Sequence, residues 1–506
     1  MKASRITLFI FSSIALLACL SGLFPNNGIT IGSLTLRFPS IADVLQPANA
    51  STTIYAESLL NEAETQLGNM LSDSENLADK EEDEVNAKFE QFNKNNPARI
   101  YFPNNDPKFF DPLFLALDSA QKTPVRIVHF GDSQIEIDRI SASLRECFQS
   151  RFGGNGPGLL PVIQTVPTIS VRQTCSNAEL PRFMPYGPAE FRIKHGRYGI
   201  MAQMTAIDGP VNCSFAAASY NDTQSRVKKF QKVSILVGNV TARLSISVSS
   251  GSYNNTQTIE PMVSSQQVTF HLPTSVSRVN VSMNGTAEIY GVMLDGEKGV
   301  SLDNIPMRGC GGTIFTAINS NEPKQFCRDN NVRLVIMQYG GNAMGYIKSK
   351  ETRTTYVENL GKQIERIKQW APNAQILFIG PSDMATSIDG TIQTYPHLPT
   401  VVDDIKAMVL SHGAAFWDLY SAMGGKNSMV QWAKSNPPLA GNDYVHFTTA
   451  GANKVSALLK QSILIYHSYY QRRNGINISP SVKNVPVQRA PNLLDSIKPF
   501  TLPMNK

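Results

Sequence analysis

The segment Val125-Arg-Ile-Val-His-Phe-Gly-Asp-Ser133 is the part of the sequence that decides the fold. It has the pattern of a short buried strand that runs into a turn, and a helical stretch follows. Similar apolar runs, separated by helical stretches, recur at residues 332–338, 375–380 and 414–419. Buried strands that alternate with helices are typical of an α/β domain with a doubly wound parallel sheet and helices on both faces.

A different pattern separates the first two of these strands. From about residue 165 to 286 the sequence is rich in Ser, Thr, Val and Asn, and apolar and polar residues alternate, as in Ala242-Arg-Leu-Ser-Ile-Ser-Val248. Alternation with a period of two and frequent turn residues indicate antiparallel strands. We therefore predict an antiparallel β-sandwich at 165–286, inserted into an α/β domain that comprises 98–164 and 287–471.

The N-terminus has the features of a targeting segment. Lys2 and Arg5 precede an apolar run, residues 6–24, whose length is within the about 17 to 25 residues that span a bilayer as a helix. The basic residues are expected to stay in the cytoplasm, so the chain after the run is exported. An uncleaved anchor is favoured because the run exceeds the about 7 to 15 residues of a cleavable signal. Lipidation at Cys19, in a sequence that resembles a lipobox, is the alternative.

Three segments lie outside the predicted domains. Residues 1–25 are the signal anchor or lipoprotein signal, and residues 26–97 form a membrane-proximal segment with a helical spacer. Residues 472–506 contain Pro, are mildly basic and show no sustained periodicity, so we predict a disordered tail.

The composition excludes several classes of protein. With 506 residues, of which 42% are apolar, the chain is long enough for two folded domains and is not disordered. The net charge of +6 is small for this length, and no predicted helix carries a stripe of Lys or Arg. Nucleic acid is therefore not an expected partner.

Six cysteines are too few for a disulfide framework in a chain of this length. An exported protein can oxidise them, and Cys310 with Cys327 or Cys175 with Cys213 are candidate pairs, with buried free thiols as the alternative. No cluster of Cys or His has the spacing of a metal site, so neither a metal nor another cofactor is predicted.

Ser133 follows the first predicted strand directly, where the chain turns through Gly131. Open α/β sheets bind their ligands at the carboxyl ends of the strands, which is where a nucleophile is useful. A Gly-Asp-Ser turn that caps a helix would have the same sequence, so this tripeptide alone leaves both interpretations open.

A second motif, Asp443-Tyr-Val-His446, lies near the other end of the chain and precedes an apolar helix. An Asp three residues before a His on one loop can orient the imidazole through one nitrogen and leave the other to accept the serine proton. Ser133, His446 and Asp443 therefore form a candidate nucleophile, base and acid.

With these motifs the chain resembles the SGNH (GDSL-like) hydrolases, whose four sequence blocks occur in a fixed order. Gly131-Asp132-Ser133 matches the first block and Asp443-x-x-His446 the last. Gly340-Gly341-Asn342 follows a predicted strand and looks like the third block. The second block, a glycine whose N–H faces the oxyanion, most resembles Gly309, with Gly311 as the alternative.

The resemblance implies a role for each matched residue. Ser133 would attack an ester carbonyl, His446 would activate it, and Asp443 would fix the tautomer of the imidazole. The oxyanion would be held by the N–H groups of Ser133 and Gly309 and by the side-chain amide of Asn342.

Two positions depart from the family pattern. Ala343 follows Asn342 where the family usually has Asp, and Gln134 follows Ser133 where many wall-polysaccharide esterases have His. Neither departure changes a residue of the triad. Asp138, five positions after Ser133, is predicted to be structural.

The long separation of Ser133 from Gly309 is similar to the peptidoglycan O-acetylesterase branch of the family. In that branch a β-sandwich that resembles a carbohydrate-binding module interrupts the catalytic domain between the first two blocks. Tyr198, Tyr220 and Tyr253 are candidates for stacking on sugar rings, but core tyrosines are commoner, so no prediction rests on them.

These features together predict an exported serine esterase, tethered to the cytoplasmic membrane by its N-terminal helix. Its expected substrate is a cell-wall or other extracytoplasmic polysaccharide that carries O-acetyl or similar small acyl groups. A polysaccharide O-acetyltransferase is an alternative, because both reactions pass through an acyl-serine. A catalytically silent glycan-binding protein and a lipase or thioesterase are further alternatives, although no long apolar lid segment is evident.

Overall fold

The structure is a computed structural model that describes residues 29–31, 34–36, 82–176, 179–218 and 226–476. The chain forms two units, residues 1–58 and 59–506. In the first unit β1 (Ile29–Ile31) pairs with β2 (Leu34–Leu36) in antiparallel fashion. No helix of the described residues is long and apolar enough to cross a membrane. The predicted span at 6–24 and most of the predicted tail lie outside these residues.

A six-stranded sheet forms the centre of the second unit. In spatial order its strands are β13 (Val300–Pro306), β4 (Val125–Gly131), β14 (Val332–Gln338), β15 (Gln375–Ile379), β18 (Ala415–Trp417) and β3 (Ile100–Tyr101). The first five are parallel and only β3 is antiparallel to its neighbour. In chain order the parallel strands lie as 2-1-3-4-5, which is a doubly wound arrangement. The predicted α/β sheet is therefore confirmed.

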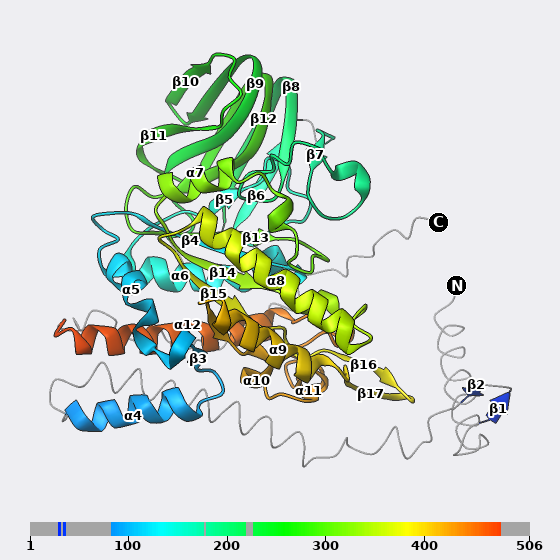
Figure 1. Ribbon diagram of the computed structural model, residues 1–506. Coiled ribbons are helices and arrows are strands. Elements are labelled where there is room, and N and C mark those ends of the chain that lie inside the picture. Colours follow the sequence, from blue (N-terminus) through cyan, green and yellow to red (C-terminus); the bar gives the residue numbers. More distant parts are fainter. Residues whose placement is uncertain (1–28, 32–33, 37–81, 177–178, 219–225, 477–506) are drawn as a thin grey trace, which may run out of the picture. The chain divides into compact units, whose positions relative to one another are not determined.

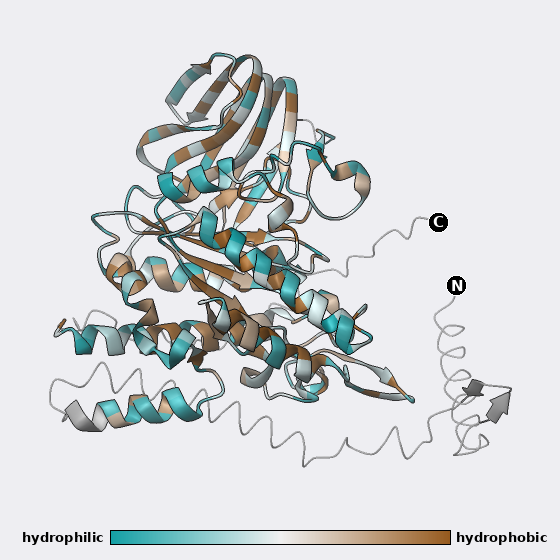
Figure 2. Ribbon diagram, viewed as in Figure 1, coloured by the Kyte–Doolittle hydropathy of each residue, from teal (hydrophilic) through white to brown (hydrophobic). Residues whose placement is uncertain are grey.

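Helices cover both faces of this sheet (Figure 1). One face packs against α5 (Asp111–Asp118), α6 (Ser141–Phe152) and α12 (Thr449–Arg473), and the other against α7 (Asn321–Asp329), α8 (Lys350–Trp370) and α9 (Leu398–Ser411). Alternate residues of β4 divide between the two cores, with Val128 and Phe130 in one and Val125 and Ile127 in the other. This burial on both sides explains why the strands are almost continuously apolar, as Figure 2 shows.

Shorter elements complete the α/β domain. The remaining helices are α4 (Glu82–Asn95), α10 (Leu419–Ala422) and α11 (Ser428–Lys434), and a hairpin is formed by β16 (Ala385–Ile388) and β17 (Thr391–Thr394). Helix α4 comes from the predicted spacer, but its apolar face packs on the domain. Phe89 and Phe92 are buried there, and the Phe89 ring stacks on Tyr469 of α12.

The inserted domain is antiparallel, as predicted, and its eight strands form one sheet. Its strands are β5 (Gly158–Leu160), β6 (Val171–Cys175), β7 (Arg182–Phe183), β8 (Met204–Ala217), β9 (Phe230–Ser250), β10 (Tyr253–Ile259), β11 (Gln266–Val276) and β12 (Arg278–Asp295). They extend past both ends of the span 165–286. All strands belong to one hydrogen-bonded sheet that encloses its own apolar core, which includes Phe215, Ile235 and Val281.

The long strand β12 bends where its pairing with β9 shifts register, between Asn284 and Gly291. Gly285 lies there with φ 146°, and a Cβ at this position would approach the Arg243 carbonyl oxygen to 2.5 Å. Only glycine fits this bend.

The inserted domain packs on the α/β domain. Leu236, Tyr290 and Met293 of the insert belong to the same buried cluster as the residues under α8 and α9. Cys147, Cys213, Cys310 and Cys327 are free thiols, and Cys175 stands directly opposite Cys213 across β6 and β8.

Candidate active site

Ser133 lies at the carboxyl end of β4, where the winding of the sheet reverses. β4 is flanked by β13 and β14, which are the second and third parallel strands of the chain. Doubly wound sheets bind ligands at such a switch point. Ser133 begins a 3₁₀ helix (Ser133–Asp138), and the Asp132 carboxylate caps this helix by accepting the N–H of Gln134 at 2.9 Å.

The structure brings Ser133 together with the predicted acid and base. The Ser133 Oγ lies 2.8 Å from Nε2 of His446, and the Nδ1 of His446 lies 2.7 Å from Oδ2 of Asp443. The other carboxylate oxygen of Asp443 accepts the backbone N–H groups of Val445 and His446, both at 3.0 Å. Asp443 therefore shapes the loop and orients the ring on it.

Asp443 and His446 lie on the open side of the site, with 52% and 40% of their side chains exposed. Partial burial by itself would raise the pKa of Asp443. The hydrogen bonds from the His446 ring and from two backbone N–H groups outweigh it, so the pKa of Asp443 lies below its usual value. This carboxylate is ionised at neutral pH.

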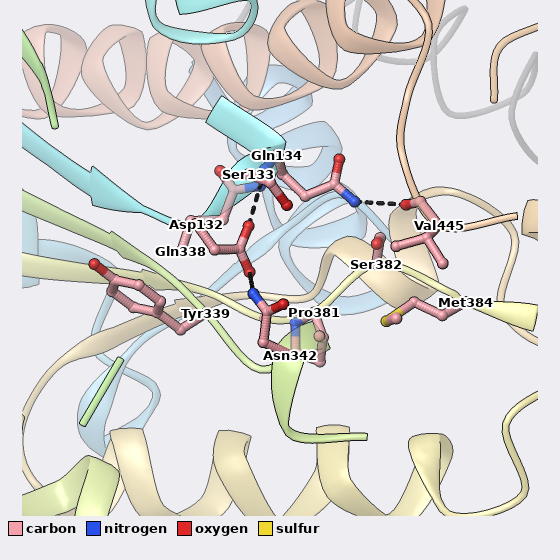
Figure 3. A pocket seen from close by; sticks show the side chains of 12 residues that line it. Asp132, Ser133, Gln134, Gln338, Tyr339, Asn342, Pro381, Ser382, Met384 and Val445 are labelled. Atoms are coloured by element: carbon pink, nitrogen blue, oxygen red, sulfur yellow. Dashed lines mark hydrogen bonds between the residues drawn. The ribbon is translucent and has the colours of Figure 1, made fainter. Parts of the chain in front are cut away.

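Asp132 lies on the buried side of Ser133, with only 4% of its surface exposed. Burial raises the pKa of Asp132 to about 6, although the Gln134 N–H, His446 and the Asn342 amide all favour its ionised form. The Asn342 Nδ2 donates to Oδ2 of Asp132 at 3.0 Å (Figure 3). It also donates to the Cys310 carbonyl at 3.2 Å.

Asn342 reaches this place because it follows β14 in a tight turn. Gly340 makes the turn with φ 131°, and a Cβ there would lie 3.0 Å from the Pro381 ring. The next position, Ala343, is fully buried and carries no carboxylate. The carboxylate that Asn342 contacts is that of Asp132.

Gly309 lies in the loop that follows β13. The N–H of Met307 in this loop donates to the Gly131 carbonyl at 2.7 Å, and Asn342 binds the Cys310 carbonyl. The loop therefore lies beside both the nucleophile turn and Asn342. In the described part of the chain neither the Gly309 N–H nor the Gly311 N–H donates a hydrogen bond, so both keep a donor for a bound group.

The sequence did not reveal the part played by Gln134. Its Nε2 donates to the Val445 carbonyl at 2.6 Å, and its Oε1 accepts the Phe447 N–H at 3.5 Å. Gln134 thus holds the residues on either side of His446. In the sequence, only its position directly after Ser133 indicated that Gln134 lies at the site.

Asp138 is buried within a structural network. It pairs with Arg145 at 2.6 Å and accepts the hydroxyl of Ser170. Both contacts hold the end of the 3₁₀ helix that begins at Ser133.

A small cavity opens at Ser133. Its volume is about 30 Å³, and Tyr339, Pro381 and Met384 give it apolar walls (Figure 3). A water molecule needs roughly 10 to 15 Å³ of such space, so the cavity has room for a short acyl group only. The described residues contain no group of three or more His, Cys, Asp or Glu side chains that could hold a metal ion.

Comparison with known proteins shows that the fold of this chain is similar to that of solved structures, whereas its sequence matches no family model. No curated protein matches the sequence either. Among 32 matching solved chains, a peptidoglycan O-acetylesterase is 18% identical, with a TM-score of 0.57 over 71% of this chain and 96% of the other. A family two carbohydrate esterase from Cellvibrio japonicus is 11% identical, with a TM-score of 0.18 over 49% and 88%. The first match shows that the chain has an SGNH hydrolase-like fold with an inserted β domain.

Proposed function

We propose that the protein is a serine esterase that removes O-acetyl or similarly small acyl groups from a cell-wall or other extracytoplasmic polysaccharide. The chain of hydrogen bonds from Ser133 through His446 to Asp443 carries this proposal. Such a chain at the switch point of a doubly wound sheet is suited to acyl transfer through an acyl-serine.

In the first half of the reaction His446 Nε2 accepts the proton of the Ser133 hydroxyl as Oγ attacks the ester carbonyl carbon. The ionised Asp443 stabilises the imidazolium that forms. His446 then donates the proton to the sugar oxygen, the C–O bond breaks, and the acyl group remains on Ser133. In the second half water attacks this ester with His446 as base, which releases the acid and restores Ser133.

The buried side of the site is suited to hold the oxyanion. Donors there are the N–H of Ser133, the N–H of Gly309 or Gly311, and the amide of Asn342, each worth roughly 2.7 to 4 kcal/mol at the transition state. Asn342 donates to Asp132 and Cys310 in the free protein, so the oxyanion must share or replace one of these acceptors. Asp132, with a pKa raised to about 6, is still mostly ionised at neutral pH, but it takes up a proton at a higher pH than an ordinary aspartate and then no longer repels the developing charge.

The size and openness of the site support a small acyl group on a large substrate. The cavity of about 30 Å³ at Ser133 fits an acetyl group, while His446 faces solvent on the other side. The expected location outside the cytoplasm rests on Lys2, Arg5 and the apolar run at 6–24.

The test is to incubate the full-length protein with acetylated peptidoglycan and with acetylated plant polysaccharides, and to quantify free acetate. We expect acetate release from at least one of them in water alone. Acetyl transfer to an added glycan without free acetate would indicate the transferase. The absence of release and transfer with every substrate, including an activated aryl acetate, would contradict the proposal.

A further inference from the structure

A second and larger cavity lies where the hydrolase domain meets the inserted β domain. Its volume of about 420 Å³ is in the range of pockets that bind small ligands. One wall consists of Glu136–Asp138 and Arg308 from the hydrolase domain. The other wall comes from residues 159–164 and 182–188. Neither wall could be assigned from sequence, since its segments are far apart along the chain.

This cavity adjoins the nucleophile. Glu136 follows Ser133 by three positions, and three residues span at most about 10 Å. Arg139 ties the wall to the loop of the candidate base, because it donates from Nε to the Glu136 carbonyl and from Nη1 to the Phe447 carbonyl, both at 3.0 Å. A sugar unit bound in the cavity therefore lies close to the acyl group that Ser133 attacks.

The wall at Ile137 is held in an unusual conformation. Ile137 and Asp138 have φ values of 65° and 69°, a region that β-branched residues rarely adopt. The bond from the Ile169 N–H to the Ile137 carbonyl and the Asp138–Arg145 ion pair keep it there. Such strained residues cluster at ligand-binding sites. As a result, an isoleucine side chain that is 36% exposed forms part of the cavity wall.

The charges of the cavity do not balance. Arg308 forms an ion pair with Glu136 at 2.6 Å, and Arg145 forms one with Asp138 at 2.6 Å. Arg182, on β7, is half-buried and forms no ion pair with another residue of the described chain. One cation in a partly desolvated cavity is left without a counter-ion.

We propose that this cavity binds the sugar unit at or next to the ester, and that Arg182 pairs there with a carboxylate of the glycan. The substrate class is then an acylated acidic polysaccharide. A planar guanidinium matches a carboxylate with two parallel hydrogen bonds, whereas a neutral glycan leaves Arg182 unpaired. Tyr186 and Ile137 in the same walls offer apolar surface to the sugar ring. This proposal rests on the esterase activity proposed above.

The test measures the kinetics of the full-length wild type and of R182Q on three substrates: a partially acetylated polyuronate, a neutral gluco-oligosaccharide acetylated to the same degree, and p-nitrophenyl acetate. We expect the wild type to prefer the polyuronate, and R182Q to raise KM for it about tenfold with kcat unchanged. Turnover of the other two substrates should not change. R182K should recover part of the loss, and R172Q, which removes an exposed cation outside the cavity, should behave as the wild type.

Equal effects of R182Q on the acidic and neutral glycans, or no effect on either, would overturn the proposal. Failure of the esterase function is distinguishable, because p-nitrophenyl acetate would then not be hydrolysed by the wild type. Calorimetric binding of deacetylated polyuronate needs no turnover. Binding that R182Q weakens about tenfold supports the subsite, and binding equal in both proteins, or absent from the wild type, contradicts it.

Discussion

Two aspartates of the candidate site lie in different surroundings: Asp132 directly precedes Ser133, and Asp443 contacts the His446 ring. Asp132 is buried and contacts the Asn342 amide, and its pKa is raised to about 6. Asp443 is half exposed and accepts three N–H groups, and its pKa is lowered. Residues of one type thus differ in pKa because one is desolvated and the other is hydrogen-bonded. The carboxylate that contacts the His446 ring keeps its charge to a lower pH than the carboxylate that contacts the oxyanion donor Asn342.

The largest effect is expected when the charge of Asp443 is removed. Asp443→Asn should lower kcat for an aryl acetate by about 10² to 10⁴, because His446 loses its tautomer and its counter-ion. The change is nearly isosteric, so KM and the thermal midpoint should stay close to those of the wild type. Wild-type kcat in the folded variant would show that Asp443 has no part in turnover.

On the buried side, Asn342→Ala should lower kcat by about 10² to 10³ through the loss of one oxyanion donor. The pKa of Asp132 should rise further, since one of its hydrogen bonds is removed. Single-turnover kinetics separate acylation from binding. A loss that appears only in KM would assign Asn342 to substrate binding instead.

A smaller effect is expected from a change of Gln134, which links the Ser133 turn to the loop that carries His446. Gln134→Ala should lower kcat by about tenfold, because the loop around His446 loses both bonds that hold it. Hydrogen exchange at residues 445–447 should become faster. Unchanged exchange together with unchanged kcat would mean that Gln134 does not position this loop.

The buried aspartate also predicts a dependence of stability on pH. Because folding raises the pKa of Asp132 from 3.8 to about 6, its contribution is complete below about pH 3.8 and is lost as pH rises through 6. The unfolding free energy of the wild type relative to Asp132→Asn should therefore fall by at most about 3 kcal/mol between pH 4 and 6.5. Asp383, whose pKa is also raised to about 6, is present in both proteins and cancels. The prediction would be contradicted if urea denaturation gave the same difference in unfolding free energy between the two proteins at both pH values.

The sequence predicts most of the parallel sheet, but it does not reveal β13. Strands such as β4 and β14 are almost wholly apolar, whereas β13 reads Val-Ser-Leu-Asp-Asn-Ile-Pro. Its Asp303 is buried because Arg126 of β4 pairs with it at 2.5 Å and also contacts Asp295. A buried ion pair between neighbouring strands hides the apolar pattern on which strand prediction depends.

In the candidate site too, residues in local motifs could be predicted, whereas contacts between distant segments could not. Ser133, Asp443 and His446 were predicted because each lies in a short motif with fixed spacing. The contacts of Gln134, the neighbours of Asp132 and the cavity at Arg182 join segments that are distant in the sequence. They depend on the folded path of loops, which local patterns do not specify.

The most direct test of the central claim compares wild type and Ser133→Ala for hydrolysis of p-nitrophenyl acetate and an acetylated polysaccharide. We expect an acetyl group on Ser133 in the rapidly quenched wild type, found by peptide mass. The folded variant should show no such adduct and a rate at least about 10⁴ lower, and His446→Ala should be equally impaired. A folded Ser133→Ala protein that hydrolyses acetyl esters as fast as the wild type would contradict the proposed role of Ser133 as nucleophile.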